Sequence, residues 1–86
     1  SVTAFRFYDR AAVVAHKQGK AAEAEKFSSI AMEVADSTGN DGLREQSFKR
    51  YLELNPKGPK RFLARYQIAY LAYKRKQFDN AVHEFK

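Results

Sequence analysis

The chain has 86 residues, 44% of them hydrophobic, and a net charge of +6, which indicates one small soluble domain. It contains no cysteine, so disulfides and thiolate metal sites are excluded. No apolar run approaches the roughly 20 residues that cross a bilayer, and the first residues have neither the basic start nor the apolar centre of a signal peptide. These features leave the compartment open between the cytoplasm and a bacterial periplasm.

The first 35 residues predict two antiparallel helices that are joined by a glycine turn. In the first helix, residues 4–17, one aromatic and three small residues share a stripe at helical spacing: Tyr8, Ala11, Ala12 and Ala15. Gly19 stands where a left-handed residue can end this helix. The second helix runs to about residue 35, and its buried side is expected to hold Ala24, Phe27, Ala31 and either Met32 or Val34.

The middle of the chain predicts a loop followed by a short helix. Residues 36–42 (DSTGNDG) are mostly turn-forming types, and we expect them to form the most mobile loop. Residues 43–54 predict a third helix that is ended by Asn55-Pro56. Its apolar positions are Leu43, Phe48, Tyr51 and Leu52.

The last third predicts two further helices. The fourth, from Pro59 to about Lys76, has Ala64, Ile68, Leu71 and Ala72 on one stripe and Phe62, Tyr66, Tyr70 and Tyr73 on the opposite one. A fifth helix is expected to begin at Asp79, which would cap it, and to pack through Ala81, Val82 and Phe85. No run alternates with period 2, so the prediction is an all-α domain of about five helices.

The positive charge is concentrated in one part of the chain. No Asp or Glu lies between Glu53 and Asp79, and seven basic residues form a predicted basic patch: Lys57, Lys60, Arg61, Arg65, Lys74, Arg75 and Lys76. Such a patch can attract an acidic protein, nucleic acid or anionic lipid. It can equally be a solvated surface that keeps the domain soluble.

These segments resemble tetratricopeptide repeats, helix-turn-helix units of 34 residues. The first copy covers residues 5–38, with Tyr8 at the large aromatic position, Gly19 at the turn, and Ala12, Ala24 and Ala31 at the small positions. A second copy covers residues 59–86, where Ile68, Ala69, Phe78, Ala81, Val82 and Phe85 match but Arg65 replaces the large aromatic residue. The amino-acid sequence of this copy is similar to repeats of bacterial cell-envelope proteins. The resemblance implies an α-solenoid of antiparallel hairpins within a single domain, residues 1–86.

The spacing departs from this family. Ala24 and Ala81 lie 57 residues apart, 11 short of two repeats, and residues 39–58 read as an irregular partial repeat. Residues 36–42 would have to cross back in extended form, or the array is irregular, or residues are absent near 37–42. Because the chain begins without Met and ends in mid-pattern, we expect a fragment of a longer array.

Catalytic chemistry is not expected. The two histidines, His16 and His83, fall on different predicted helices, and neither is paired with a metal-binding motif. The glycines are scattered rather than gathered in a phosphate-binding loop. We therefore expect no enzyme activity, no metal and no cofactor, and a surface or edge position for His83.

Binding is the function that the resemblance implies, because first helices of successive repeats line a concave groove. The groove positions carried over to this sequence are Arg6, Asp9, Val13, His16, Lys17, Leu63, Tyr66, Tyr70, Tyr73 and Lys74. Tyrosine suits this role, since its ring and hydroxyl offer contact area at low entropic cost. Tyr66 and Tyr70 are assigned equally to groove or core, and Tyr73 is expected to be partly buried. The partner would be a protein or peptide, and the basic rim favours an acidic one; nucleic-acid binding through residues 57–76 and self-association are the alternatives.

Overall fold

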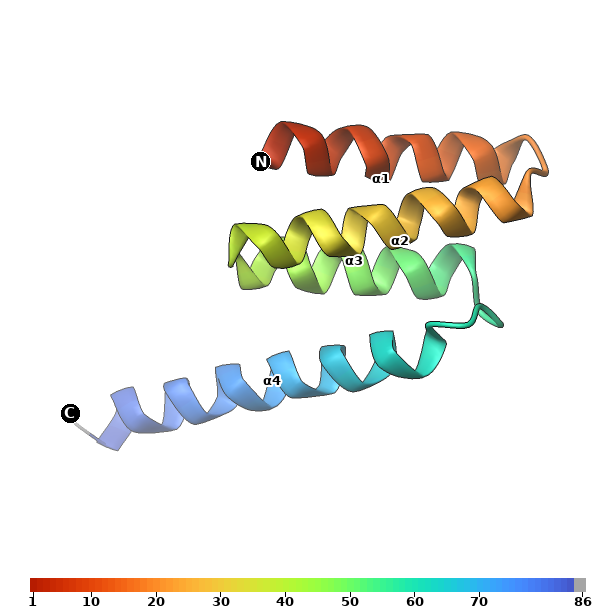
Figure 1. Cartoon of the computed structure of the whole chain (residues 1–86). Helices are drawn as coiled ribbons and strands as arrows, with labels where there is room; N and C mark the ends of the chain where they lie inside the picture. Colours follow the sequence, from red (N-terminus) through yellow and green to blue (C-terminus); the bar gives the residue numbers. More distant parts are fainter. Residues whose placement is uncertain (85–86) are drawn as a thin grey trace.

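The protein is all-helical, as the sequence predicts. The computed structural model describes the backbone of residues 1–84 and the side chains of residues 1–81, and no strand occurs among them. The helices are α1 (Val2–Lys17), α2 (Ala21–Thr38), α3 (Asp41–Leu54) and α4 (Arg61–Glu84) (Figure 1). The positions predicted for the side chains of Val82, His83 and Phe85 lie outside the described residues.

Glycine turns the chain between α1 and α2, as predicted. Gly19 has a φ of +74°, a conformation that side-chain-bearing residues rarely adopt. The amide of Gly19 donates to the carbonyl of His16, and that of Lys20 donates to the carbonyl of Ala15. These two bonds form a Schellman motif, which satisfies the last carbonyls of α1 and reverses the chain direction.

The prediction of a mobile loop at residues 36–42 is wrong, because only Gly39 and Asn40 separate α2 from α3. The polar residues at the end of α2 find partners without leaving the helix: Ser37 and Thr38 donate to carbonyls within α2, and Asp36 pairs with Arg44 of α3 at 2.9 Å. Gly39 then takes a φ of +69°, and the Asn40 side chain accepts from the Leu43 amide as the cap of α3. An extended crossover of seven residues is therefore excluded.

The break predicted between a fourth and a fifth helix is also absent. α4 is one continuous helix of 24 residues, and Asp79 lies inside it rather than at a cap. No glycine or proline follows Pro59 in the sequence, so nothing stops the helix where the repeat pattern would place a turn. Ala81, expected to pack in a hairpin, is exposed.

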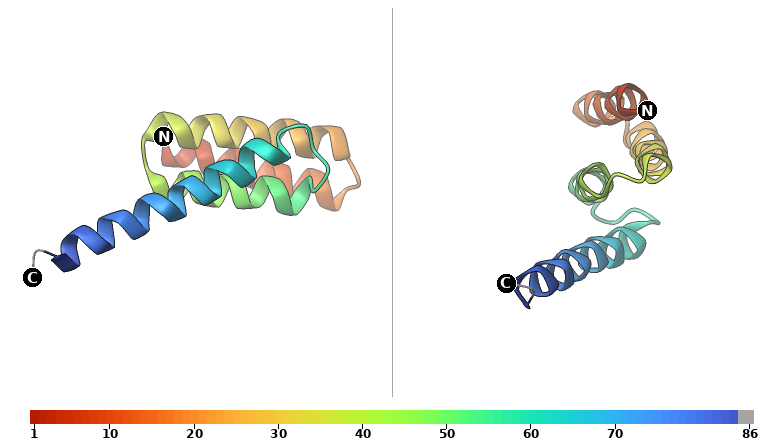
Figure 2. Two further views of the ribbon diagram at one scale, coloured as in Figure 1. Left: turned by 90° about the horizontal axis from the view of Figure 1, so that it is seen from below. Right: turned by 90° about the vertical axis from the view of Figure 1, so that its left-hand side faces the viewer.

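The four helices stack in chain order, each antiparallel to the one before. α1 packs on α2, α2 on α3, and α3 on α4, with a smaller contact between α1 and α3 (Figures 1 and 2). Alanine allows the first helices to lie close together, since Ala12, Ala15, Ala24 and Ala31 are all buried. Phe5 and Ala35 complete this first cluster with Ala31. The predicted small-residue stripe thus builds the α1–α2 hairpin.

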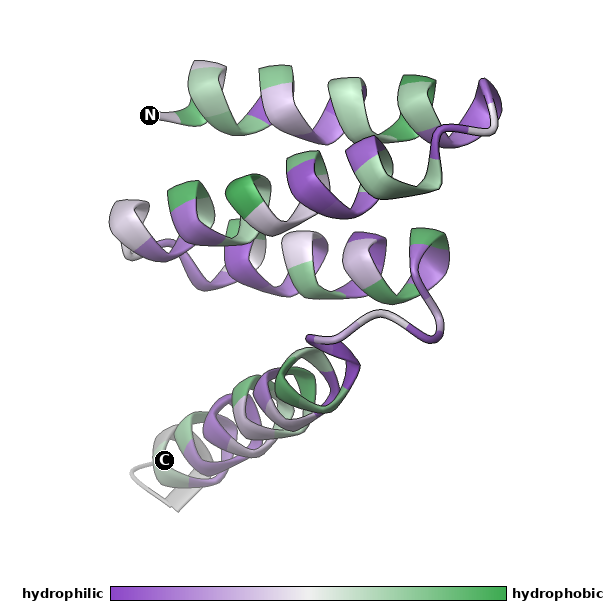
Figure 3. Cartoon of the chain, turned by 45° about the vertical axis from the view of Figure 1, so that its right-hand side comes forward, coloured by the Kyte–Doolittle hydropathy of each residue, from purple (hydrophilic) through white to green (hydrophobic). Residues whose placement is uncertain are grey.

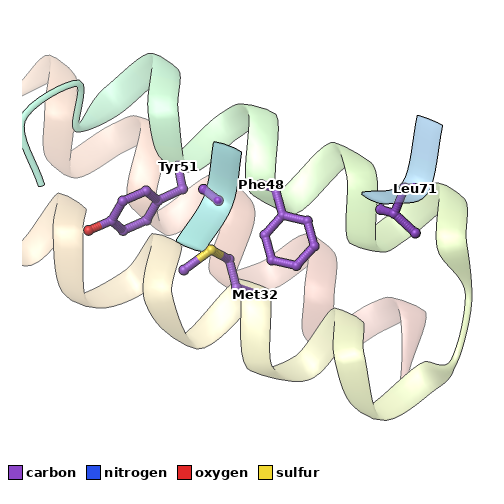
Figure 4. Close-up of a cluster of buried hydrophobic side chains, with 5 residues drawn as sticks. Met32, Phe48, Tyr51 and Leu71 are labelled. Carbon is purple, nitrogen blue, oxygen red and sulfur yellow. The ribbon is translucent and has the colours of Figure 1, made fainter. Parts of the chain in front are cut away.

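A second cluster joins α2, α3 and α4. It consists of Met32, Phe48, Tyr51, Ala64 and Leu71, with Leu52 and Ile68 packed against it (Figure 4). Only small and aliphatic residues of α4 enter this cluster, whereas α3 supplies both large aromatic rings. The large side chains that fill the space between α3 and α4 therefore come from α3.

The hydroxyl of Tyr51 joins three segments inside this cluster. Tyr51 is fully buried, and its hydroxyl donates to the carboxylate of Glu25 in α2 at 2.6 Å. The same oxygen accepts from the backbone amide of Lys60 at 3.0 Å, immediately before α4. Burial, followed by the Glu25 hydrogen bond, raises the pKa of Tyr51 to about 12.

The connector between α3 and α4 is built around the same ring. Asn55 donates through its amide nitrogen to Ser28 of α2 at 2.9 Å, and the Lys60 ammonium group donates to Ser29. Gly58 passes so close that a Cβ there would lie 2.5 Å from the Tyr51 hydroxyl oxygen. The connector is thus tied to α2 by polar contacts and fixes where α4 begins.

Tyr51→Phe should destabilise the protein by about 1–3 kcal/mol at neutral pH, because it leaves Glu25 and the Lys60 amide without their partner. Tyrosine titrates near 10.0 when unfolded and at about 12 here, so the folded state holds the proton more tightly. This contribution is complete below pH 10 and is lost as pH rises towards 12, by at most about 3 kcal/mol. Urea melts at neutral and alkaline pH measure both effects. Tyr66→Phe, which alters an exposed ring, is the matched control and should lose stability at alkaline pH as the unaltered chain does. If Tyr51→Phe lost as much stability at alkaline pH as the unaltered chain, the assignment of that loss to Tyr51 would be contradicted.

Gly58→Ala should cost about 1–3 kcal/mol, since its methyl group collides with the Tyr51 ring and hydroxyl. The collision with the hydroxyl disappears in Tyr51→Phe, so the two substitutions should be coupled by about 1 kcal/mol. A double-mutant cycle of urea melts measures this coupling. Strict additivity would show that the close approach does not determine the cost.

Candidate functional site

One face of α4 packs on the core, as predicted. Ala64 and Leu71 are buried against α3, and Ile68 is half-buried beside them. Ala72, placed on the same stripe by the sequence, is exposed. The inner face is therefore narrower than predicted, and its buried part stops near Asp41, the first residue of α3.

The opposite face of α4 carries large apolar side chains that nothing in the described part of the chain covers. Tyr66 and Tyr73 each follow a buried residue, Ala64 or Leu71, by two positions, which turns them about 200° around the helix. The outer ridge, as we name this face, consists of Phe62, Leu63, Tyr66, Tyr70 and Tyr73, whose exposed fractions are 64%, 49%, 67%, 44% and 62%. All five lie within about 100° around the helix, so they form one continuous stripe.

The partial burial predicted for Tyr73 is wrong, and the other two tyrosines are not core residues. Among the described residues α4 packs mainly on α3 and meets Met32 of α2 in the same cluster, so its inner face is the one that is covered. The sequence left open whether Tyr66 and Tyr70 belong to a groove or to the core; both lie on the surface. Hydrophobic and hydrophilic residues alternate along α4 in Figure 3, as expected for a helix with two apolar stripes.

The α1 residues assigned to the groove lie on a different surface. Asp9 is committed to the fold, because its carboxylate accepts from the Arg50 guanidinium of α3 at 3.0 Å and its side chain is only 13% exposed. Val13 is half-buried, whereas Arg6, His16 and Lys17 are exposed. The pairing with Arg50 directs this side of α1 towards α3.

The structure does not bring the α1 set and the α4 tyrosines together. In the described part of the chain α1 and α4 make no contact, and they lie at opposite ends of the stack with α2 and α3 between them (Figure 2). The concave groove that the repeat pattern implied between these helices is therefore not formed in residues 1–81. The groove is not formed because the tyrosine face of α4 points away from the helices on which α4 packs.

The predicted basic patch is divided between structural and exposed cations. Lys74 pairs with Asp41 at 3.0 Å, and Arg75 pairs with Glu45, so both attach α4 to the start of α3. The hydrogen bond from Lys74 lowers the pKa of Asp41. Lys49, and then Arg75, lower that of Glu45.

The remaining basic residues surround the outer ridge. Lys60 donates to Ser29, and Arg61 donates to the carbonyl of Gly58 while its guanidinium lies 4.5 Å from the ring centre of Phe62. Lys57, Arg65 and Lys76 are exposed and form no ion pair with the described residues. The ridge is thus bordered by positive charge, and the Arg61 guanidinium lies over one of its rings, that of Phe62.

A groove between α1 and α2 was not foreseen from the sequence. It has a volume of about 350 Å³, and its lining includes the apolar Phe7, Ala11, Val14 and Phe27 and the charged Arg10 and Glu23. Phe7 and Val14 lie on the side of α1 roughly opposite Asp9, and Phe7 is 66% exposed. The signal was present in the sequence, since Phe7, Ala11 and Val14 stand at i, i+4 and i+7.

A smaller notch of about 250 Å³ lies where α4 extends past α3, between Asp41 and Phe78. Phe78 follows Leu71 by seven residues and continues the inner stripe, yet it is 68% exposed. α4 has 24 residues and α3 has 14, so the stripe outlasts its partner helix.

Two further searches of the described residues give negative findings. No helix there has the length and apolar character needed to cross a membrane. No three His, Cys, Asp or Glu side chains there are grouped so that they could hold a metal ion.

Comparisons with known proteins give no relative: no protein-family model, curated protein or solved structure matches the chain.

Tyr66→Ala and Tyr73→Ala should each change the free energy of unfolding by no more than about 0.5 kcal/mol, because both rings are on the surface. Leu71→Ala, on the inner face of the same helix, should cost about 2–4 kcal/mol. Thermal or urea melts of the three variants provide the measurement. A loss of stability at Tyr66 or Tyr73 as large as that at Leu71 would mean that the ridge is part of the core.

Proposed function

We propose that this chain is a protein-interaction module, a scaffold of helical hairpins of the tetratricopeptide type, whose outer ridge binds a protein or peptide partner. The observation that carries the proposal is the ridge itself: five large apolar side chains on one face, each between 44% and 67% exposed. A continuous apolar stripe of this kind is unusual on a monomer, because it leaves hydrophobic surface in water. A binding partner removes that surface from water.

The ridge has the composition of a binding surface. Four of its five residues are aromatic, and three are tyrosines, which combine a broad ring with a hydroxyl that stays hydrated at the rim. Aromatic anchors of this type supply most of the binding energy at many interfaces. A regular helix also holds them at fixed spacing, so little conformational entropy is lost on binding.

The shape and charge of the ridge favour one class of partner. A straight stripe along one helix fits the apolar face of a second helix, by packing of ridges into grooves. Arg65 and Lys76 border the stripe on one side without an ion pair among the described residues. The best partner is therefore an amphipathic helix with acidic residues next to its apolar face.

Nucleic-acid binding is the second candidate, supported by the interleaving of aromatic and basic residues in α4. Against it, Lys74 and Arg75 already neutralise Asp41 and Glu45, so fewer cations remain to follow a phosphate backbone. Titration with single-stranded oligothymidylate at two salt concentrations separates the two candidates. Tight, strongly salt-dependent binding there would favour this alternative.

The test of the proposal uses a designed amphipathic helical peptide with Leu on one face and Glu beside it, labelled for fluorescence anisotropy. We expect saturable binding that weakens at least about tenfold in the Tyr66→Ala/Tyr73→Ala double variant, the loss typical of removing two anchors. Phe78→Ala is the matched control, because Phe78 is an equally exposed aromatic residue, at 68%, but continues the inner stripe of α4. Equal losses in both variants, or none in the double variant, would contradict a binding role for the ridge.

A further inference from the structure

We propose that the partner of the outer ridge is the α1–α2 groove of a second copy of this chain, so that copies associate head to tail. The proposal rests on the proposed function and names its partner. The stack has α1 at one end and α4 at the other (Figure 2). Each end carries an apolar surface that the described residues leave uncovered: the groove at α1–α2 and the ridge on α4. One surface is hollow and the other stands out along a helix, so they are complementary in form.

The two surfaces match in length. Along α1 and its C-cap the groove is lined from Phe7 to Gln18, and on α4 the ridge runs from Phe62 to Tyr73. Both intervals span eleven residue steps, or about 17 Å of helix. A helix laid along the groove therefore meets lining residues over the whole ridge.

The lining of the groove suits a closely packed helix. The lining contains the small Ala11 and Ala15 together with the larger Phe7, Val14 and Phe27. Small residues already allow α1 and α2 to pack against each other in the fold. The same feature allows the rings of a tyrosine-bearing helix to enter between the larger residues.

The direction of the helices is also consistent. α1 and α3 run one way, and α2 and α4 run the other way (Figure 1). A second copy in the same orientation would place its α1 antiparallel to α4 of the first. The alternation within the fold would then continue across the contact, with the helix dipoles opposed.

Charge distinguishes this arrangement from a symmetric one. Residues 1–38 carry five basic and five acidic residues, whereas residues 55–86 carry eight basic and two acidic residues. A ridge-to-ridge dimer would bring together two segments that stay positive even with Lys74 and Arg75 paired to Asp41 and Glu45, and these segments repel each other. Head-to-tail contact places the positive segment against a neutral one, with Glu23 in the lining of the groove.

Such a contact is heterologous, because it joins different surfaces on the two copies. Each added copy leaves one groove and one ridge open, so growth continues with concentration instead of stopping at a dimer. Blocking one surface in each of two variants therefore converts an open series into a defined pair. This property provides the test.

The test compares two blocked variants. Phe7→Lys/Val14→Lys closes the groove and leaves the ridge, while Tyr66→Lys/Tyr73→Lys closes the ridge and leaves the groove. The control, Ala22→Lys/Gln46→Lys, adds the same charge at exposed positions outside both surfaces. Circular dichroism melts confirm folding, and Phe7→Ala and Tyr73→Ala repeat the comparison if a lysine variant does not fold. Sedimentation equilibrium from micromolar to near-millimolar concentration, at low salt, measures the average mass.

We expect the unaltered chain and the control to grow in mass beyond a dimer as concentration rises. Each blocked variant alone should remain a monomer, and an equimolar mixture of the two should stop at a dimer. Self-association of the groove-blocked variant alone would overturn the proposal in favour of ridge-to-ridge contact. A monomeric unaltered chain at every concentration, or a mixture that stays monomeric, would also overturn it.

The result is separable from the fate of the proposed function. If the unaltered chain is monomeric but the acidic helical peptide still requires Tyr66 and Tyr73, the ridge binds a different protein and only the head-to-tail proposal fails. If the peptide binds independently of these tyrosines, the proposed function fails as well.

Discussion

The hydroxyl of Tyr51 is the contact on which the arrangement of α4 depends. It is buried between Glu25 of α2 and the backbone amide of Lys60, so one side chain of α3 joins its two neighbours. The amide it holds stands immediately before α4, and Gly58 has no room for a side chain next to it. The start of α4 is therefore fixed from inside the core, and the direction of its faces follows from that position.

The remaining attachments of α4 lie along its inner face at increasing distance from Tyr51. Ala64 and Leu71 are buried in the second cluster, and the pairs of Lys74 with Asp41 and Arg75 with Glu45 follow towards the C-terminal side. The outer ridge occupies the stretch between the connector and these ion pairs. A stripe held at both ends is pre-organised, which reduces the entropy lost when it binds.

The sequence predicted the local features of the fold better than its connections. The Gly19 turn follows from backbone sterics, and the alanines of α1 and α2 follow from periodicity, because both depend on nearby residues. The loop at residues 36–42 was mispredicted because Asp36 is stabilised by Arg44 of the next helix, a partner that composition does not reveal. The missing break in α4 has a similar origin: the repeat template required a turn that no residue of this chain supplies.

The candidate site also combines features that local spacing predicts with features that only the packing of the helices determines. Two opposite apolar faces on α4 could be predicted from spacing alone, and the structure contains both. Whether the tyrosine face is covered depends on which helix lies next to it, and that is a property of the whole stack. In the described residues α2 and α3 separate α1 from α4, and the two end helices each keep an apolar surface that no other helix covers. The order of packing, more than any single residue, therefore places the ridge and the α1–α2 groove where two copies can meet.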